Sequence, residues 1–320
     1  MSEFAFACCA PGMERALKSE VARVAPSWRL AFSRPGLVTF KAEHIDERIE
    51  LVFAHVWGRS RGRAETPAAA RELCAGVDRV HVFARDPDET IDLAAIKRDL
   101  GATEEPARAG ELVADVIVSG ADDAIVVGEH RASDRRGAYP GGGFGVVVPD
   151  DAPSRAYAKI EEAIAWRHLD VKAGQTALEI GAAPGGAVLA LLRRGVNVVG
   201  VDTGAIDPHV LAYRHANGAH VTHLPIKVGA LRWEAMPARV DWLLVDVNLA
   251  PQVAIHSIAR LMPPMRDSLR GVVFTLKLNE LRFAEELPSL LGRLEQLGFT
   301  DARARHLPSN RQEVCAVGLR

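Results

Sequence analysis

The feature that most constrains the fold is the stretch at 177–186, which reads Ala-Leu-Glu-Ile-Gly-Ala-Ala-Pro-Gly-Gly. A short apolar run containing Glu179 enters a glycine- and proline-rich turn. Apolar residues at helical spacing then leave it, at Val188, Leu189, Leu191 and Leu192. This order predicts a strand, a tight turn and a helix, the first βα unit of an open nucleotide-binding sheet. Glycine tolerates positive φ in such a turn and lets the backbone approach a ligand closely.

A second strand, expected at 197–202, ends in Asp202 about 20 residues after the turn. An acidic residue at this place can accept hydrogen bonds from the two hydroxyls of a ribose. A plain loop is the alternative, since Gly/Pro turns are common. The flanking strands and the acid favour a nucleoside-cofactor site. The residues we expect to contact the cofactor are Gly181, Ala183, Pro184, Gly185, Gly186, Asp202 and Asp246.

The segment around this turn has the alternation of an α/β, Rossmann-like, doubly wound sheet. Strands are expected near 177–181, 197–202, 219–224, 241–246 and 271–276, with helices between them. Residues 300–306 and 313–319 are expected to add an antiparallel pair at the sheet end. A helix capped by Ser154 and running to about Leu169 precedes the first strand.

The amino-terminal half predicts smaller α+β structure. Residues 1–65 show a strand at 4–9, a helix at 14–24, a strand ending at Phe40 and a helix at 46–53. Residues 66–150 show a strand at 80–83, a helix at 92–100 and strands at 112–119 and 124–129, the last two joined by a turn at 120–123. Pro149 to Pro153 marks the expected boundary with a third domain at 151–320.

Composition limits the function classes. The chain has 320 residues, a formal net charge of −2 and four cysteines without metal-ligand spacing. It shows no secretory signal and no apolar run of membrane-spanning length, so we expect a cytoplasmic protein with reduced thiols, no metal and no membrane partner. Any affinity for nucleic acid must come from local patches. Two arginine groups are candidates, each read either as solvated loop or as a phosphate-contacting strip: Arg59, Arg61 and Arg63, and Arg131, Arg135 and Arg136.

Four side chains stand where chemistry is expected. Asp246 and Lys277 end the fourth and fifth strands, and ligands of open α/β sheets bind outside the carboxyl ends of strands. Glu313 begins the last strand, and Lys159 lies on the helix before the sheet. A buried lysine beside a second lysine is expected to have a lowered pKa, which suits it to act as a general base near neutral pH.

The carboxyl-terminal half resembles the FtsJ-like ribose 2′-O-methyltransferases, whose Lys-Asp-Lys-Glu tetrad corresponds to Lys159, Asp246, Lys277 and Glu313. The resemblance extends to the RlmM-type enzymes that modify large-subunit ribosomal RNA. It rests on residues 7–14 (ACCAPGME), 151–163 (DAPSRAYAKIEEA), 274–278 (FTLKL) and 310–314 (NRQEV).

The resemblance implies a class I methyltransferase sheet preceded by a ferredoxin-like unit (1–65) and a THUMP-like RNA-binding domain (66–150). The implied cofactor is S-adenosyl-L-methionine, and the implied substrate is a ribose 2′-hydroxyl, specifically that of a cytidine in 23S ribosomal RNA. Lys277 would be the base and Asp246 would position it, while Lys159 and Glu313 would tune the site and hold the ribose. The implied partner is large-subunit ribosomal RNA or its assembly intermediate, and we expect the protein to act as a monomer.

Three positions depart from the family pattern. Ala187 replaces a tryptophan, Lys227 an acidic residue and Ala156 a serine, and these differences bear on cofactor affinity. Two other functions therefore stay open. One is an RNA-binding or ribosome-assembly protein whose cofactor site has decayed. The other is a small-molecule O-methyltransferase, which would not need the amino-terminal half.

Overall fold

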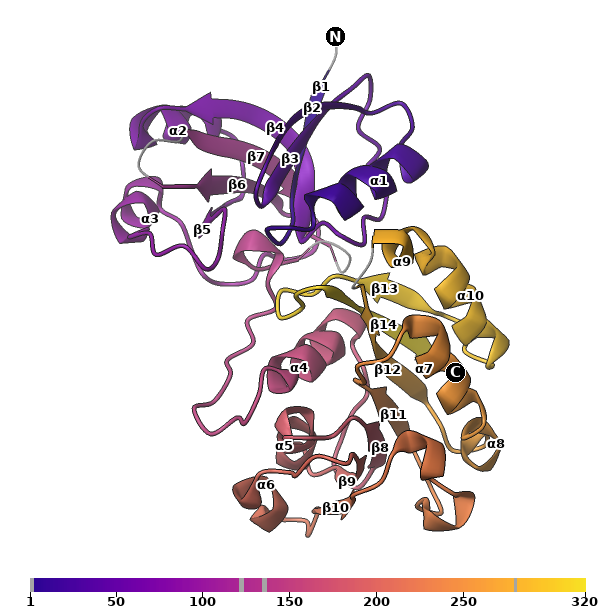
Figure 1. Cartoon of the computed structure of the whole chain (residues 1–320). Coiled ribbons are helices and arrows are strands. Elements are labelled where there is room, and N and C mark those ends of the chain that lie inside the picture. The colour runs from indigo at the N-terminus through magenta and orange to yellow at the C-terminus, as the bar shows by residue number, and fades with distance from the viewer. Residues whose placement is uncertain (1–2, 121–123, 134–136, 279–280) are drawn as a thin grey trace. The chain divides into compact units, whose positions relative to one another are not determined.

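The computed structural model describes residues 3–120, 124–133, 137–278 and 281–320. The chain divides into two compact units, Met1–Gly145 and Val146–Arg320, called here the first and second unit (Figure 1). The break falls four residues before the boundary expected at Pro149. The finer division of residues 1–150 into two domains stays a prediction.

The first unit is built on one seven-stranded sheet with the strand order β2-β3-β1-β4-β7-β6-β5. Neighbouring strands are antiparallel except β5 and β6, which run parallel. Its elements are β1 (Glu3–Cys8), α1 (Glu14–Val24), β2 (Arg29–Arg34), β3 (Leu37–Ala42), β4 (Val56–Ala64), α2 (Pro67–Leu73), β5 (Arg79–Ala84), α3 (Ala94–Leu100), β6 (Leu112–Val118), β7 (Ile125–Arg131) and the 3₁₀ turn η1 (Pro140–Gly142).

Strand β4 joins the two halves of this sheet, because it pairs with β1 on one side and β7 on the other. Arg59, Arg61 and Arg63 lie on this strand, so the prediction of a loop there is wrong. The alternating burial of a strand was hidden by the run of arginines and by Gly62, where the β4–β7 register shifts.

The helix predicted at 46–53 is absent; the segment forms turns instead. The buried carboxylate of Glu20 on α1 accepts hydrogen bonds from the backbone N–H groups of Val52, at 2.7 Å, and Phe53, at 3.1 Å. These contacts with α1 hold the segment in a non-helical conformation. The apolar residues that suggested a helix, including Leu51 and Phe53, are buried without forming one.

The two faces of the first sheet carry different cores. On one face, α2 and α3 pack over Val82, Val116, Val118 and Val127. Successive residues of a strand point to opposite faces, so Ile117 lies on the other face, where it clusters with Phe6, Cys8, Leu37 and Val56.

The second unit is also built on a seven-stranded sheet, with the order β10-β9-β8-β11-β12-β14-β13. All its pairings are parallel except those that β14 makes with β12 and β13. Its elements are α4 (Ala156–Arg167), β8 (Thr176–Ile180), α5 (Gly186–Arg193), β9 (Asn197–Val201), α6 (Pro208–Ala212), β10 (Val221–Leu224), η2 (Val228–Ala230), η3 (Trp233–Ala235), β11 (Trp242–Val245), α7 (Pro251–Ala259), α8 (Met262–Met265), β12 (Gly271–Lys277), α9 (Leu281–Glu285), α10 (Leu287–Gln296), β13 (Arg303–Arg305) and β14 (Glu313–Leu319).

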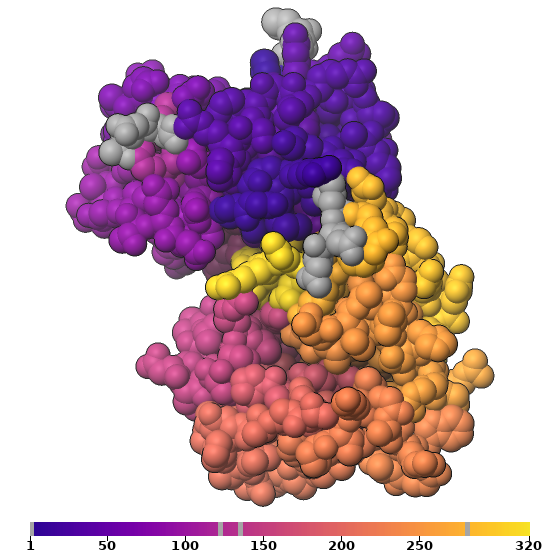
Figure 2. Space-filling model, viewed as in Figure 1, coloured from indigo at the N-terminus to yellow at the C-terminus, as the bar shows by residue number. Residues whose placement is uncertain are grey.

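The predicted strands of this unit are confirmed to within two or three residues at each end. Numbered within the unit, the strand order is 3-2-1-4-5-7-6, and strand 7 is the antiparallel one. The predicted antiparallel pair at the end of the sheet is confirmed: β13 is the edge strand, and β14 lies between β13 and β12. Helix α4 contacts β14 although the two are far apart in sequence. On the surface, the pink segment around α4 lies beside the yellow segment that precedes β14 (Figure 2).

Helix α4 begins at Ala156 and ends at Arg167. Ser154 lies just outside it, and its Oγ accepts a long hydrogen bond of 3.4 Å from the N–H of Ala156. The helix ends because His168 takes a left-handed conformation, with φ of 49°. None of the helices in the described residues has the length and apolarity needed to cross a membrane.

Candidate active site

The glycine turn after β8 is shaped by close packing against its surroundings. Gly181 has φ of +90°, and a Cβ atom there would lie 2.0 Å from the carbonyl oxygen of Asp246. Gly185 has φ of +111°, and a Cβ on Gly186 would lie 2.3 Å from the Oγ of Ser154. The turn therefore brings the ends of β8 and β11 together and begins α5 at the same edge of the sheet.

Asp202 holds this turn in place from the end of β9. One carboxylate oxygen accepts the N–H of Ala183 at 3.0 Å, and the other accepts the N–H of Gly204 at 2.8 Å. Each carboxylate oxygen has a second lone pair, so both can still accept a hydrogen bond from a hydroxyl. Asp202 is at the predicted edge of the sheet, and it has a structural role that the sequence did not indicate.

The four predicted catalytic side chains come together at the carboxyl edge of the sheet. Lys159 is on α4, Asp246 follows β11, Lys277 ends β12 and Glu313 begins β14. The Nζ of Lys277 donates to Asp246 Oδ1 at 2.8 Å and to Glu313 Oε2 at 2.7 Å. The Nζ of Lys159 donates to Asp246 Oδ2 at 2.9 Å and also contacts Glu313 Oε1. The ring of alternating lysine and carboxylate is thus closed.

The charges in this ring stabilise one another. Burial alone would raise the pKa of Asp246, but the charges of Lys159 and Lys277 outweigh it and lower that pKa below its ordinary value. Burial alone would likewise lower the pKa of Lys277, but the Asp246 charge, with the hydrogen bonds that the Lys277 Nζ donates to Asp246 and Glu313, raises it above its ordinary value. The expectation of a lowered lysine pKa is therefore wrong for the free protein. The prediction took account of the second lysine, but the sequence did not reveal that each lysine contacts two carboxylates.

A buried carboxyl group lies beneath the ring. Glu179 on β8 is fully buried, and its Oε2 has no hydrogen-bond partner among the described residues. Burial, followed by the nearby charges of Asp246 and Asp202, raises the pKa of Glu179 well above its ordinary value. Three carboxyl groups therefore surround the glycine turn. Glu179 was noted in the sequence only as an acidic residue in an apolar strand.

The three carboxyl groups and the glycine turn fit the implied cofactor. S-adenosylmethionine carries a positive sulfonium and an ammonium group, and a cation near three carboxyl groups relieves their mutual repulsion. The glycine turn offers close backbone approach, and Asp202 offers acceptors for ribose hydroxyls. A small pocket beside the ring is lined by Lys159, Glu179 and Asp246, and also by Ala156 and Ala187, two of the three positions that depart from the family pattern. Lys227, the third, is exposed at the start of η2.

Other sequence candidates lie outside this site. Arg135 and Arg136 are outside the described residues, and Arg131 ends β7 in the first unit. The described residues contain no group of three histidine, cysteine or acidic side chains placed to hold a metal ion.

Several known proteins resemble this chain. A family model described as FtsJ-like methyltransferase matches residues 152–283. Ribosomal RNA large subunit methyltransferase M of Thauera aminoaromatica is 34% identical over 182 residues, which cover 53% of this chain and 47% of that protein. The protein of the same name from Marinobacter nauticus is 29% identical across 96% of both chains. That from Chromohalobacter salexigens is 29% identical across 92% of this chain and 82% of its own.

The chain thus spans about half the length of some curated relatives and nearly the whole length of others. Among solved structures, TrmN from Thermus thermophilus has 16% identity over the full length of both chains, with a TM-score of 0.36. The strand order, the site and the family match define the second unit as a class I methyltransferase domain of the FtsJ-like kind. Along nearly its whole length the chain is similar to proteins named ribosomal RNA large subunit methyltransferase M, and the match of the second unit to the FtsJ-like methyltransferase model confirms the prediction of S-adenosylmethionine as cofactor.

Proposed function

We propose that the protein transfers a methyl group from S-adenosylmethionine to the 2′-hydroxyl of a ribose in large-subunit ribosomal RNA, with a cytidine of 23S RNA as the target. The observation that carries the proposal is the closed ring of Lys159, Asp246, Lys277 and Glu313 beside the glycine turn. The names of the relatives support ribosomal RNA as the substrate. Only RNA offers a 2′-hydroxyl, so the chemistry and the substrate class agree.

In this proposal the cofactor supplies an activated methyl group and a positive charge. Lys277 removes the proton of the 2′-hydroxyl, and its Nζ is held in place by two acceptors, Asp246 and Glu313. Asp246 orients both lysines through its two carboxylate oxygens. Lys159 and Glu313 hold the ribose. Keeping nucleophile and methyl group in line contributes much of the acceleration.

The raised pKa of Lys277 sets a condition on this mechanism. At neutral pH the amine of the free protein carries a proton and cannot accept another. A second positive charge at the turn, or a substrate hydroxyl that displaces a carboxylate partner, lowers the pKa of Lys277. The base therefore forms only when the site is loaded. This keeps the lysine protonated, and not reactive as a nucleophile, in the absence of substrate.

The first test is calorimetric titration with S-adenosylmethionine, followed by transfer of labelled methyl to unmodified ribosomal RNA. We expect cofactor binding and label that depends on RNA. The modified ribose is recognised because a 2′-O-methyl group protects the adjacent phosphodiester from alkaline cleavage. A reaction without RNA on small hydroxyl compounds serves as the control.

Two outcomes contradict the proposal. No binding at millimolar cofactor would mean that Ala187 and Lys227 have cost the site its function and that the chain is an RNA-binding protein. Label on a base, or label independent of RNA, would exclude ribose 2′-O-methylation as the activity.

A further inference from the structure

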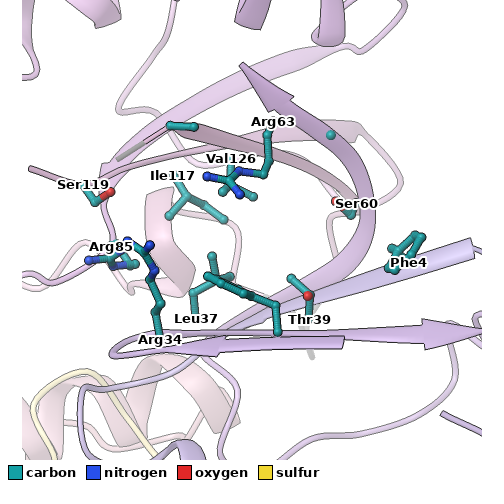
Figure 3. A pocket seen from close by; sticks show the side chains of 13 residues that line it. Phe4, Arg34, Leu37, Thr39, Ser60, Arg63, Arg85, Ile117, Ser119 and Val126 are labelled. Carbon is teal, nitrogen blue, oxygen red and sulfur yellow. The ribbon is translucent and has the colours of Figure 1, made fainter. Parts of the chain in front are cut away.

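The first unit contains a pocket formed by strands of its own sheet (Figure 3). Its volume is about 230 Å³. This is below the about 300–1,000 Å³ of typical small-molecule sites, so the pocket suits one planar ring system rather than a larger ligand. The floor is apolar, with Leu37 from β3, Ile117 from β6 and Val126 from β7. It lies on the face opposite to that covered by α2 and α3, because Ile117 points away from Val116 and Val118.

The rim carries positive charge. Arg34, Arg63 and Arg85 line the pocket, and none of the described residues that line it is an aspartate or a glutamate. Figure 3 shows Arg34 and Arg85 at one end, with Arg63 reaching over Ile117 and Val126. Guanidinium groups gathered without a carboxylate in the lining favour an anionic ligand, and their forked donors suit phosphate.

Arg63 differs from its neighbours on β4. Arg59 forms ion pairs with Glu3 and Glu129, and Arg61 pairs with Glu129 and donates to two backbone carbonyls. Among the described residues, Arg63 makes no hydrogen bond or ion pair. The sequence does not distinguish these three arginines; of the three, Arg63 is the one without such a partner among the described residues, and it lines the pocket.

Aromatic and hydroxyl groups complete the lining. Phe4 is 45% exposed and Phe32 is 39% exposed, which is high for phenylalanine in a folded sheet. The guanidinium of Arg34 lies 5.5 Å from the centre of the Phe32 ring. Thr39, Ser60 and Ser119 add hydroxyls that can donate or accept hydrogen bonds. Stacking rings beside arginines and hydroxyls form the combination that binds unstacked nucleotides.

We propose that this pocket binds one unstacked nucleotide of a single-stranded RNA segment. The base packs on the apolar floor and against an exposed phenylalanine, and Arg63 with the Arg34–Arg85 end contacts the flanking phosphates. This inference deepens the proposed function and rests on it for the identity of the ligand as RNA. A base-paired segment is a poorer ligand, because its bases are stacked and cannot enter the pocket.

The test is fluorescence anisotropy of the full-length protein, without cofactor, against an unstructured pentaribonucleotide. Arg63→Gln removes the available guanidinium, and Thr39→Phe fills the pocket without changing charge. Arg15→Gln is the matched control, because Arg15 is an exposed arginine on α1 in the same unit with the same charge change, and does not line the pocket. Thermal melting verifies that each variant is folded.

We expect Arg63→Gln and Thr39→Phe to weaken binding about tenfold and Arg15→Gln to weaken it less than about twofold. Loss of one phosphate contact should also reduce the slope of log K against log salt by about 0.7 in Arg63→Gln. A duplex of the same sequence should bind more weakly than the single strand. Equal losses in Arg63→Gln and Arg15→Gln, preference for the duplex, or equal affinity for an acidic peptide would each overturn the proposal.

The two proposals fail separately. If RNA is not methylated but the oligonucleotide still depends on Arg63, the pocket stands and the proposed reaction is wrong. If the wild type methylates RNA and Arg63→Gln changes neither the oligonucleotide affinity nor the KM for RNA, the reaction stands and the pocket is not a nucleotide site.

Discussion

Replacing Lys277 by alanine tests the centre of the proposed mechanism. Its Nζ touches Asp246 at 2.8 Å and Glu313 at 2.7 Å, so the substitution removes the proposed base and one of two cations in the ring. A positioned base contributes about 10²–10⁴-fold to a rate. We therefore expect methyl transfer to fall by at least about a hundredfold in a single-turnover assay with labelled cofactor.

The same substitution changes stability by a smaller amount. Asp246 keeps Lys159 as a partner, and the Lys277 side chain is 17% exposed, so water can reach part of the vacated site. The cost should lie between that of a surface pair, about 0–1 kcal/mol, and that of a fully buried pair, about 3–5 kcal/mol. A value near 2 kcal/mol leaves the protein folded at room temperature. Affinity for S-adenosylmethionine should change little.

Lys172→Ala is the matched control for this experiment. Lys172 also pairs with an aspartate, Asp170, but both side chains are more than half exposed and lie away from the ring. Its rate should equal that of the wild type, and its stability should change by less than about 0.5 kcal/mol. Wild-type transfer by a folded Lys277→Ala protein would show that Lys277 is not the base.

Three further predictions concern pH and packing. Because the pKa of Lys277 is raised, kcat/KM for RNA should increase with pH through the neutral range. The apparent pKa of this increase should be lower at saturating than at limiting cofactor. A pH profile that is flat from neutral pH upward would contradict this prediction. Burial raises the pKa of Glu20 from 4.5 to about 7, so the folded state takes up a proton that the unfolded state has lost. The free energy of unfolding should therefore fall by up to about 3 kcal/mol as the pH rises from about 4.5 to 7. In Glu20→Gln the free energy of unfolding, measured by urea titration at several pH values, should depend less on pH. Gly181→Ala should cost more stability and more cofactor affinity than Gly174→Ala, because both have positive φ but only Gly181 would place a Cβ against the Asp246 carbonyl; equal melting temperatures would refute the close-packing argument.

The second unit was largely predictable because its signals are local. Each parallel strand is a short apolar run between turns, and Asp246 and Lys277 directly follow or end such runs. The position of Glu313 opposite Lys277 was harder to predict from the sequence, because it depends on the antiparallel pairing of β14 with β12, which joins residues far apart in sequence. The chain position of Glu313 gave no indication of that register, and the family resemblance supplied it.

The first unit was predicted less well for a related reason. The arginine-rich strand β4 has too few apolar residues to stand out, and its identity depends on the partners β1 and β7. The difference between Arg63 and Arg61 depends on Glu129, which is 68 residues from Arg61 in sequence. The pKa of Lys277 was predicted with the wrong sign because its nearest charges come from Asp246 and Glu313 rather than from Lys159.

The interior position of β14 has a consequence for how activity arises in time. Lys159 lies before the first strand of the second unit and Glu313 begins its last strand, so their contact is among those of greatest sequence separation in the unit. Closing such contacts has a high entropic cost and comes late in folding. A nascent or proteolysed chain without β14 therefore has the glycine turn but not the complete ring. In the proposed mechanism such a chain is chemically inert because it lacks Glu313, so methyl transfer reports that the second unit has finished folding.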